Sequence, residues 1–373
     1  GIDWHAMRDR YRPDIESAEN IVDFSRISYQ MLFELRLSHL LVADEEMLKT
    51  YVPALFAEGS VGLDVRWIEK RAVVTRIRPG SPGRAAGFKP GGVITRIDGR
   101  EVGEIVRQAL FLPPYNERNR RGGISNTLMG HIDGPADTSV SITFLDEQSR
   151  ENQVVMTRRS KGEGQVIHEA MPPAFIEFEA KRLDGGVGYF RFNHFAPPVD
   201  TAFAEALEGM RDARGLIFDL RGNPGGYFRV MDAMVEQLIS EKTTLYQFRL
   251  RDKRVERVLA PAERPYEKPV VVLIDVTSTS CSEHFAACLQ AIGRATVIGE
   301  HSPGYLLGAD WMRLPNGLSF MHTILQPIPS DGRIVEGQGV RPDVEIALTR
   351  VVLLDCRDAQ IEAAVAHILG TKQ

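Results

Sequence analysis

The spacing of hydrophobic positions divides the chain into three stretches. From residue 3 to about residue 55 these positions recur at steps of three and four, which predicts helical structure with one buried face. The recurring positions are Phe24, Ile27, Met31, Leu35 and Ser38. Asp14 and Ser17 carry side chains suited to a helix N-cap, and Pro53 and Gly59 are expected to end the helical stretch.

The second stretch, from Gly59 to about Arg159, combines short hydrophobic runs with turn residues and therefore predicts strands. It contains the runs 61–65, 72–77 and 90–99, a short helical turn at 83–87 and a last strand at 139–144. Residues 104–131 are rich in Arg, Asn and Pro, and we expect them to form an insertion before the last strand.

The third stretch, from about residue 165 to residue 347, alternates strand and helix patterns. The predicted strands are 186–192, 215–220, 270–275 and 295–299, and the predicted helices are 201–213, 231–239 and 282–292. Such alternation is typical of an α/β layered core. A closing helix is expected at 351–369.

Length and charge narrow the class of protein. A chain of 373 residues is too long for a single core and suits two or three domains. The hydrophobic fraction of 43% and the charged fraction of 25% are ordinary for a soluble globular protein. The net charge of -5 argues against a nucleic-acid partner, and the one short basic run, residues 118–121, is expected to be a solvated insertion.

The sequence contains no clear pattern for a membrane span, a disulfide framework or a metal site. The most apolar run, residues 269–275, has the length of a buried strand and is too short to span a bilayer. Cys281, Cys288 and Cys356 show no CxxC spacing and no even count, so neither a disulfide framework nor a zinc site is indicated. The chain starts at Gly1 without Met or a signal peptide, which is expected of a mature or truncated form.

Two stretches carry residues suited to catalysis. Residues 219–226 follow a predicted buried strand, and Gly225 and Gly226 could expose successive amides as an oxyanion hole needs, although a plain tight turn has the same composition. A phosphate loop is excluded because no Gly-Lys-Ser/Thr follows. Ser280 stands at a strand-to-helix junction, where Ser280-x-x-Glu283 is typical of a capping box and also places a hydroxyl at a helix N-terminus.

Several histidines could act as a base. His39 lies one turn beyond Leu35 on a predicted apolar face, where either a buried core histidine or a base would fit. His194 is the second candidate, and His301 and His322 are weaker ones. No two histidines have the helical spacing of metal ligands, so no metal is expected.

The motifs resemble two known modules. Gly80-Ser-Pro-x-x-x-Ala-Gly-x-x-x-Gly91 followed by Ile94-x-x-Ile-Asp-Gly99 resembles a PDZ domain. Residues 219–226 (DLRGNPGG), the segment around Ser280 (family pattern SASExFA) and residues 336–343 (ExxGVxPD in the family) resemble the carboxyl-terminal processing and tricorn-core serine peptidase superfamily. This resemblance implies a mixed-sheet α/β core of the ClpP/crotonase-like type. An N-terminal helical cap would cover residues 1–57, an inserted PDZ-like domain 58–160 and the peptidase core 161–373.

The same resemblance implies roles for single residues. Ser280 would be the nucleophile, with the amides of Gly225, Gly226 and Cys281 as oxyanion donors. Relatives with a serine–lysine dyad carry lysine 25 residues after the serine, where this chain has Tyr305. The tricorn-core branch instead implies His39 as the base, with Ser38 and Glu336 behind it.

The implied function is that of a serine endopeptidase working through an acyl-enzyme without a cofactor. Its partners would be peptides or unfolded proteins, and a homo-oligomer is compatible with the family. A substrate C-terminus would add a strand beside Leu63 and Val65, with amides near Gly62 and Leu63 receiving its carboxylate, unless the domain only packs against its neighbour. The alternatives are a non-catalytic peptide-binding scaffold and a hydrophobic-ligand carrier of the same fold. Many relatives are exported, which favours an extracytoplasmic location.

Overall fold

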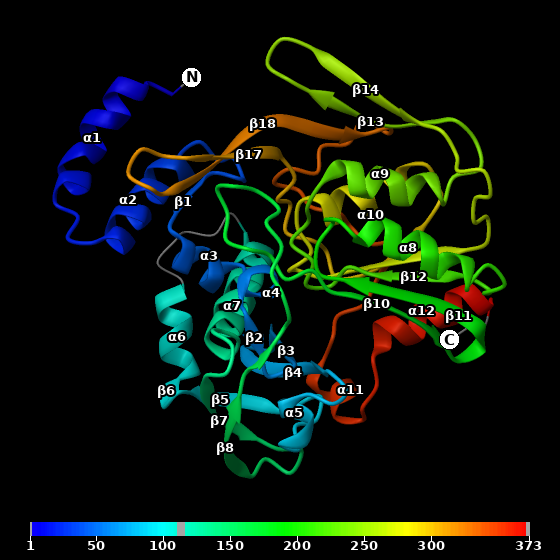
Figure 1. Cartoon of the computed structure of the whole chain (residues 1–373), viewed down its shortest axis with the longest axis horizontal. Helices are drawn as coiled ribbons and strands as arrows, with labels where there is room; N and C mark the ends of the chain where they lie inside the picture. Colours follow the sequence, from blue (N-terminus) through cyan, green and yellow to red (C-terminus); the bar gives the residue numbers. More distant parts are fainter. Residues whose placement is uncertain (1, 110–115, 371–373) are drawn as a thin grey trace.

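The computed structural model describes residues 2–109 and 116–370, and its mainly parallel sheet is formed by strands between residues 178 and 345 (Figure 1). This sheet has the order β10-β11-β12-β15-β16-β19, in which β10 is antiparallel to β11 and the remaining neighbours are parallel. The strands are β10 (Phe178–Leu183), β11 (Val187–Phe192), β12 (Leu216–Asp219), β15 (Val270–Ile274), β16 (Thr296–Gly299) and β19 (Val344–Glu345). A 3-10 turn, η1 (Asp184–Gly186), joins the first two strands.

Helices cover both faces of this sheet. They are α8 (Val199–Glu208), α9 (Phe228–Glu236), α10 (Cys281–Ala291) and α12 (Ala359–Leu369), while α11 (Arg350–Leu354) packs through Leu353 against Ile68, Val73 and Val93 instead. In β15, Val272 faces the hydrophobic cluster of α8, α9 and α10, whereas Val271 and Leu273 face the cluster that contains α12. Burial on both faces explains why this strand is a continuous apolar run, as predicted. The predicted closing helix is two helices, because Cys356 has a φ of 56° and Asp358 caps α12.

A second, antiparallel sheet had no counterpart in the sequence analysis. Its order is β1-β18-β13-β14, with β17 paired to β18. The strands are β1 (Leu41–Ala43), β13 (Thr243–Arg249), β14 (Arg254–Leu259), β17 (Gly308–Arg313) and β18 (Ser319–Pro329). Because Leu41 pairs with Met321, this sheet fixes the segment just before residue 41 beside the C-terminal half of the chain.

The N-terminal segment is helical, but it is not continuous. Its helices are α1 (Trp4–Glu16), α2 (Ile21–Phe33), α3 (Glu45–Tyr51) and α4 (Pro53–Phe56). The expected caps were wrong: Ser17 ends α1, and Asn20 caps α2 by accepting a hydrogen bond from the Asp23 N–H. The periodic pattern continues past Phe33, yet Arg36 and His39 take positive φ angles, so Ser38 lies in a turn and not on a helix face.

We refer to residues 59–160 as the small domain. Its main sheet has the order β3-β4-β5-β7-β8, with β6 beside β5, while β2 pairs with β9 where the chain enters and leaves. The elements are β2 (Gly59–Ser60), β3 (Leu63–Ile68), β4 (Arg71–Ile77), α5 (Pro82–Ala85), β5 (Val93–Ile97), β6 (Arg100–Glu101), α6 (Val102–Ala109), α7 (Glu117–Ile132), β7 (Ser139–Leu145), β8 (Glu151–Thr157) and β9 (Arg159–Ser160). The borders predicted at residues 58 and 160 stay a prediction, with which the β2–β9 pairing is compatible.

The segment at residues 104–131, expected to form an insertion before the last strand, is helical in its described part. Helices α6 and α7 occupy the described part of this segment, and residues 118–121 form the first turns of α7 with Asn119 buried. The helix packs both through the apolar residues Ile124, Leu128 and Ile132, a spacing that the sequence analysis missed, and through glycines. A Cβ on Gly122 would lie 2.4 Å from Val276 O, and one on Gly130 would lie 2.2 Å from Thr50 O.

The described residues were also compared with the requirements of a membrane-spanning helix and of a metal site. No helix among them combines the length and the apolar character that crossing a bilayer requires. Nor do three or more His, Cys, Asp or Glu side chains gather there in a way that could hold a metal ion.

Candidate active site

The candidate site lies at the carboxyl ends of the parallel strands β11, β12, β15 and β16. The loops that follow β11, β12, β15 and β16 all leave from the carboxyl ends of parallel strands, where open α/β sheets bind their ligands. These loops carry His194, the Gly225–Gly226 turn, Ser280 and Tyr305. The strand topology therefore gathers four segments that are far apart in sequence.

Four side chains form one continuous line of hydrogen-bond contacts. Ser280 Oγ lies 3.0 Å from His39 Nε2, and His39 Nδ1 lies 2.7 Å from Ser38 Oγ. Ser38 Oγ in turn donates to Glu336 Oε2 at 2.9 Å. The structure thus brings together the four residues that the sequence analysis grouped, although Ser280 and His39 are 241 positions apart.

Glu336, the last residue of this line, accepts only, and this determines which atom donates in each of the other hydrogen bonds. The Ser38 hydroxyl has one proton and gives it to Glu336, so it accepts from His39 Nδ1–H. His39 Nε2 is then a bare lone pair that accepts from the Ser280 hydroxyl. The carboxylate also accepts from the Ser38 and Leu306 amides, each at 2.8 Å, which hold it in place.

Burial shifts the ionisation of this group of residues. It lowers the pKa of His39 to about 4, so the imidazole is neutral near pH 7. Burial also raises the pKa of Glu336, while hydrogen bonds from Ser38 and Leu306 counteract that rise. A neutral imidazole is the form that can take a proton from a hydroxyl.

Ser280 occupies a strained bend between β15 and α10. Its φ of 55° and ψ of -121° are unusual for a residue with a side chain, and such strain is often found at functional sites. Its N–H donates to Tyr305 O at 2.8 Å and more weakly to Glu283 Oε2 at 3.3 Å. Glu283 therefore reaches back to the start of the helix, as a capping box requires, while the Ser280 hydroxyl is turned to His39.

Glu283 is a structural anchor that the sequence analysis read only as a cap. Its carboxyl accepts from Ser302 Oγ and from the Gly304 and Tyr305 amides. Burial raises its pKa to about 7, against the effect of those hydrogen bonds. Glu283 thereby ties the loop after β16 to the helix that starts at Ser280.

The structure corrects one of the three predicted oxyanion donors. The Gly225 N–H donates to Asn223 Oδ1 at 2.8 Å and is therefore engaged. Gly225 instead permits a close approach, since a Cβ there would lie 2.6 Å from Ser280 Cβ and 2.8 Å from Cys281 N. The amides of Gly226 and Cys281 stay candidates, the second at the N-terminus of α10.

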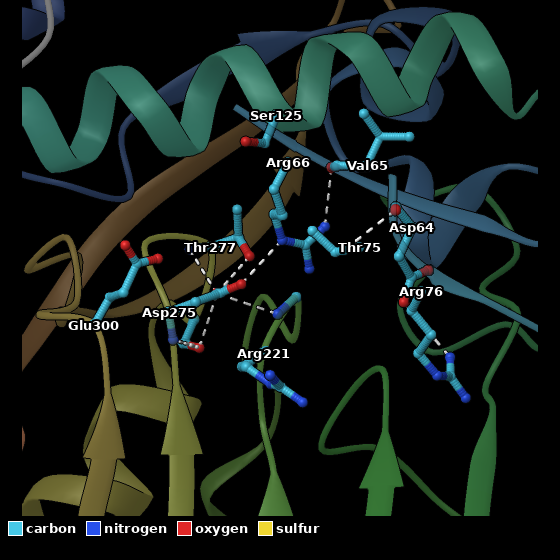
Figure 2. Close-up of polar contacts among 12 residues, drawn as sticks. Asp64, Val65, Arg66, Thr75, Arg76, Ser125, Arg221, Asp275, Thr277 and Glu300 are labelled. Atoms are coloured by element: carbon cyan, nitrogen blue, oxygen red, sulfur yellow. Dashed lines mark hydrogen bonds and ion pairs between the residues drawn. The ribbon is translucent and has the colours of Figure 1, made fainter. Parts of the chain in front are cut away.

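The carboxylate of Asp275 holds two segments in place, the one that leads to the Gly225–Gly226 turn and the one that leads to Ser280 (Figure 2). Asp275 Oδ1 accepts from the Thr277 N–H at 2.8 Å and the Gly222 N–H at 3.3 Å. From β3 of the small domain, Arg66 Nε reaches Asp275 Oδ2 at 2.9 Å. Burial acts to raise the pKa of Asp275, but Arg66 and the Thr277 hydrogen bonds bring it below its ordinary value. One buried carboxylate thus links the small domain to the segment that carries Ser280.

A cavity of about 470 Å³ opens beside Ser280 and His39. Most of its wall is apolar, and among the described residues that line it there is no Lys or Arg. Its apolar members include Leu48, Leu55, Phe56, Met171, Leu307 and Trp311. Tyr305, which stands at the dyad-lysine position, lines this cavity too.

Comparison with known proteins relates the core to a family. Residues 186–346 match the family model described as Peptidase family S41. This part of the chain, which we call the S41-like domain, is therefore similar to that family. This domain holds Ser280, Glu336 and both glycines of the turn, whereas His39 and Ser38 come from outside it.

Relatives of the S41-like domain extend the similarity beyond the core. The carboxyl-terminal-processing protease of Synechocystis sp. is 27% identical over 296 residues, which cover 78% of this chain and 63% of the relative. The putative tricorn protease homolog 2 of Streptomyces coelicolor is 26% identical over 390 residues, covering 98% of this chain and 30% of the relative. The chain spans less than two thirds of the length of either relative.

A solved structure agrees with the predicted architecture. Mature CPAF complexed with lactacystin superimposes with a TM-score of 0.63 at 14% identity, covering 99% of this chain and 94% of that one. At this identity the likeness concerns the fold. The prediction of an α/β fold of the S41 protease type is confirmed.

The three other candidate histidines stand apart from the line of contacts. His194 lines the cavity, but within the described chain it makes no hydrogen bond to Ser280. His301 Nε2 contacts Gln338 O at 2.9 Å, and His322 lies on β18 with its ring against Phe320. The geometry therefore favours His39 over the second candidate.

The predicted peptide-binding strand is covered on its open side. Leu63 and Val65 are buried on β3, and the Gly62 N–H donates to Ser60 Oγ at 3.0 Å. The Trp67 N–H donates to Ser125 Oγ at 3.0 Å, and the Val65 N–H lies 3.3 Å from Met129 Sδ. Both partners belong to α7, so a peptide could add to this edge only if α7 moved away.

Proposed function

We propose that the chain is a serine endopeptidase of the carboxyl-terminal processing and tricorn-core type, with Ser280 as nucleophile and His39 as base. The observation that carries the proposal is the unbroken line of contacts from Ser280 through His39 and Ser38 to Glu336. A nucleophile, a base and a group that orients the base are the parts that acyl transfer by serine needs.

The proposed reaction starts with attack of Ser280 Oγ on the peptide carbonyl carbon. The Ser280 proton passes to His39 Nε2, and the positive charge that forms on the ring is compensated by Glu336 through Ser38. The amides of Gly226 and Cys281 would stabilise the negative charge on the carbonyl oxygen.

Breakdown of the tetrahedral intermediate completes the cycle. The C–N bond breaks as His39 returns the proton to the leaving amine, which leaves an ester on Ser280. Water then attacks the ester, His39 takes its proton and returns it to Ser280 Oγ, and the acid product is released. No cofactor takes part.

Covalent labelling by a fluorophosphonate probe tests the proposed nucleophile. Wild-type protein should react at Ser280, and the Ser280→Ala variant should neither label nor hydrolyse a peptide. Ser149→Ala, which removes a hydroxyl from an exposed turn of the small domain, should label like the wild type. Absence of labelling in folded wild-type protein would instead favour a non-catalytic scaffold.

We further propose that the small domain is a PDZ-like domain that recruits substrate C-termini along β3 once α7 has been displaced. Exchanging Ser125 and Met129 for alanine removes the side chains that face the Trp67 and Val65 amides. In the Ser280→Ala background, this double variant should bind a free-acid peptide more tightly than the parent, and Thr127→Ala should not. Equal affinity for the free acid and its C-terminal amide would contradict recruitment by the carboxylate.

A further inference from the structure

His194 is a cavity-lining residue that the proposed reaction leaves unused. It follows β11 and lines the same cavity as Ser280 and Gly226. Its neighbours are tightly held: Asn193 Nδ2 donates to Ala54 O at 2.8 Å and to Phe175 O at 2.7 Å, and the Phe195 N–H donates to Gly225 O at 2.7 Å. The imidazole is therefore presented to the cavity from a fixed backbone, directly beside the glycine turn.

The two ring nitrogens of His194 have different surroundings. The residue is only 9% exposed. Nδ1 is fully enclosed and has no hydrogen-bond partner in the described part of the chain, whereas Nε2 is not among the enclosed atoms without a partner. Because the residue lines the cavity and its Nδ1 is enclosed, Nε2 is the ring nitrogen available to a bound molecule.

The enclosure of His194 Nδ1 indicates which ring nitrogen carries the proton. Burial lowers the pKa of His194 to about 4, so the ring is neutral near pH 7 and carries one proton. A buried N–H without an acceptor is rarer in proteins than an acceptor without a donor. We therefore assign the proton to Nε2, which makes His194 a hydrogen-bond donor toward the cavity.

We propose that His194 is a substrate-binding residue whose Nε2–H donates a hydrogen bond to a backbone carbonyl of the peptide bound beside Ser280. An extended peptide presents such carbonyls regularly along its length, and no Lys or Arg among the described lining residues competes for them. The inference rests on the peptidase function proposed above and adds a residue that holds the substrate without taking part in proton transfer.

Paired variants separate the donor from the shape of the ring. His194→Gln keeps an N–H near the position of Nε2, His194→Asn places the same amide one methylene short of it, and His194→Phe keeps a ring without a donor. We expect kcat/KM for an internally quenched peptide to fall about tenfold in the Asn and Phe variants and to stay within about threefold in the Gln variant. The rate of labelling by a small fluorophosphonate, which has no peptide backbone, should be unchanged in all three.

The substrate side gives an independent measurement. In a peptide series where each backbone carbonyl in turn is replaced by an alkene isostere, one replacement should slow the wild type about tenfold yet leave the His194→Asn variant unaffected. Wild-type kcat/KM in the Asn and Phe variants, or a Gln variant as slow as Asn, would overturn the inference while labelling at Ser280 persists. A labelling rate that drops in His194→Phe as much as in His39→Ala would place His194 in the chemistry instead. Failure of the wild type to label would overturn the peptidase proposal itself.

Discussion

Peptide hydrolysis by the His39→Ala variant is expected to fall by about 10³-fold or more in kcat. The Ser280 hydroxyl is a poor nucleophile unless a base takes its proton, and His39 Nε2, at 3.0 Å, is the base that the geometry offers. Steady-state kinetics with a quenched peptide measures the loss, and fluorophosphonate labelling should slow in parallel. His322→Ala, at a histidine outside the cavity lining, is the matched control and should keep wild-type kinetics.

The pH dependence of the wild type provides the signature of this base. His39 works only when neutral, and burial lowers its pKa to about 4, so protonation of His39 should cause no loss of kcat/KM as the pH falls from 7 to 6. An ordinary histidine, with a pKa of about 6.5, would already be mostly protonated at pH 6. Protonation of His39 should lower activity only as the pH falls toward 4, and protonation of Glu336, whose pKa is raised by burial, acts in the same direction. A His39→Ala variant with full activity would contradict the assignment.

The sequence predicted the parallel core better than the rest of the fold. The run of β15 is continuous because both of its faces are buried, and such a run is recognisable without any partner. The pattern gave no signal for β14, whose residues are mostly exposed, and the sequence analysis missed α7, whose buried face mixes Ile124, Leu128 and Ile132 with glycines and polar residues. These elements depend on contacts with residues far away in the sequence, and a local hydrophobic pattern carries no information on such contacts.

The candidate site followed from motif resemblance and not from periodicity. By spacing alone His39 reads as a core histidine on a helix, whereas it lies in a turn whose position is set by the pairing of β1 with β18. Glu336 reaches Ser38 across 298 positions, which no local pattern encodes. The engagement of the Gly225 amide by Asn223 was missed because it depends on the conformation of the turn and not on its composition.

The Gly225→Ala variant is expected to lose about 10²- to 10³-fold or more in kcat/KM while remaining folded. Its φ of 108° is rarely adopted by a residue with a side chain, and the new Cβ would lie 2.6 Å from Ser280 Cβ and 2.8 Å from Cys281 N. The turn and the nucleophile must therefore move apart, and a shift of about 1 Å at a reacting group is enough to cost about 10²-fold. The same shift would displace the Cys281 amide, one of the two remaining oxyanion candidates.

A substitution at a second glycine, Gly293, distinguishes the effect of the steric clash at Gly225 from the effect of backbone strain. Gly293 has a φ of 69° and no atom within 4 Å of the position that a Cβ would take, so Gly293→Ala carries strain without a collision. We expect both variants to melt somewhat below the wild type, but only Gly225→Ala to lose labelling at Ser280 and peptide hydrolysis. If Gly225→Ala kept the labelling rate of Gly293→Ala, the close packing of the glycine turn against Ser280 would have no part in activating it, and the oxyanion assignment to this turn would have to be abandoned.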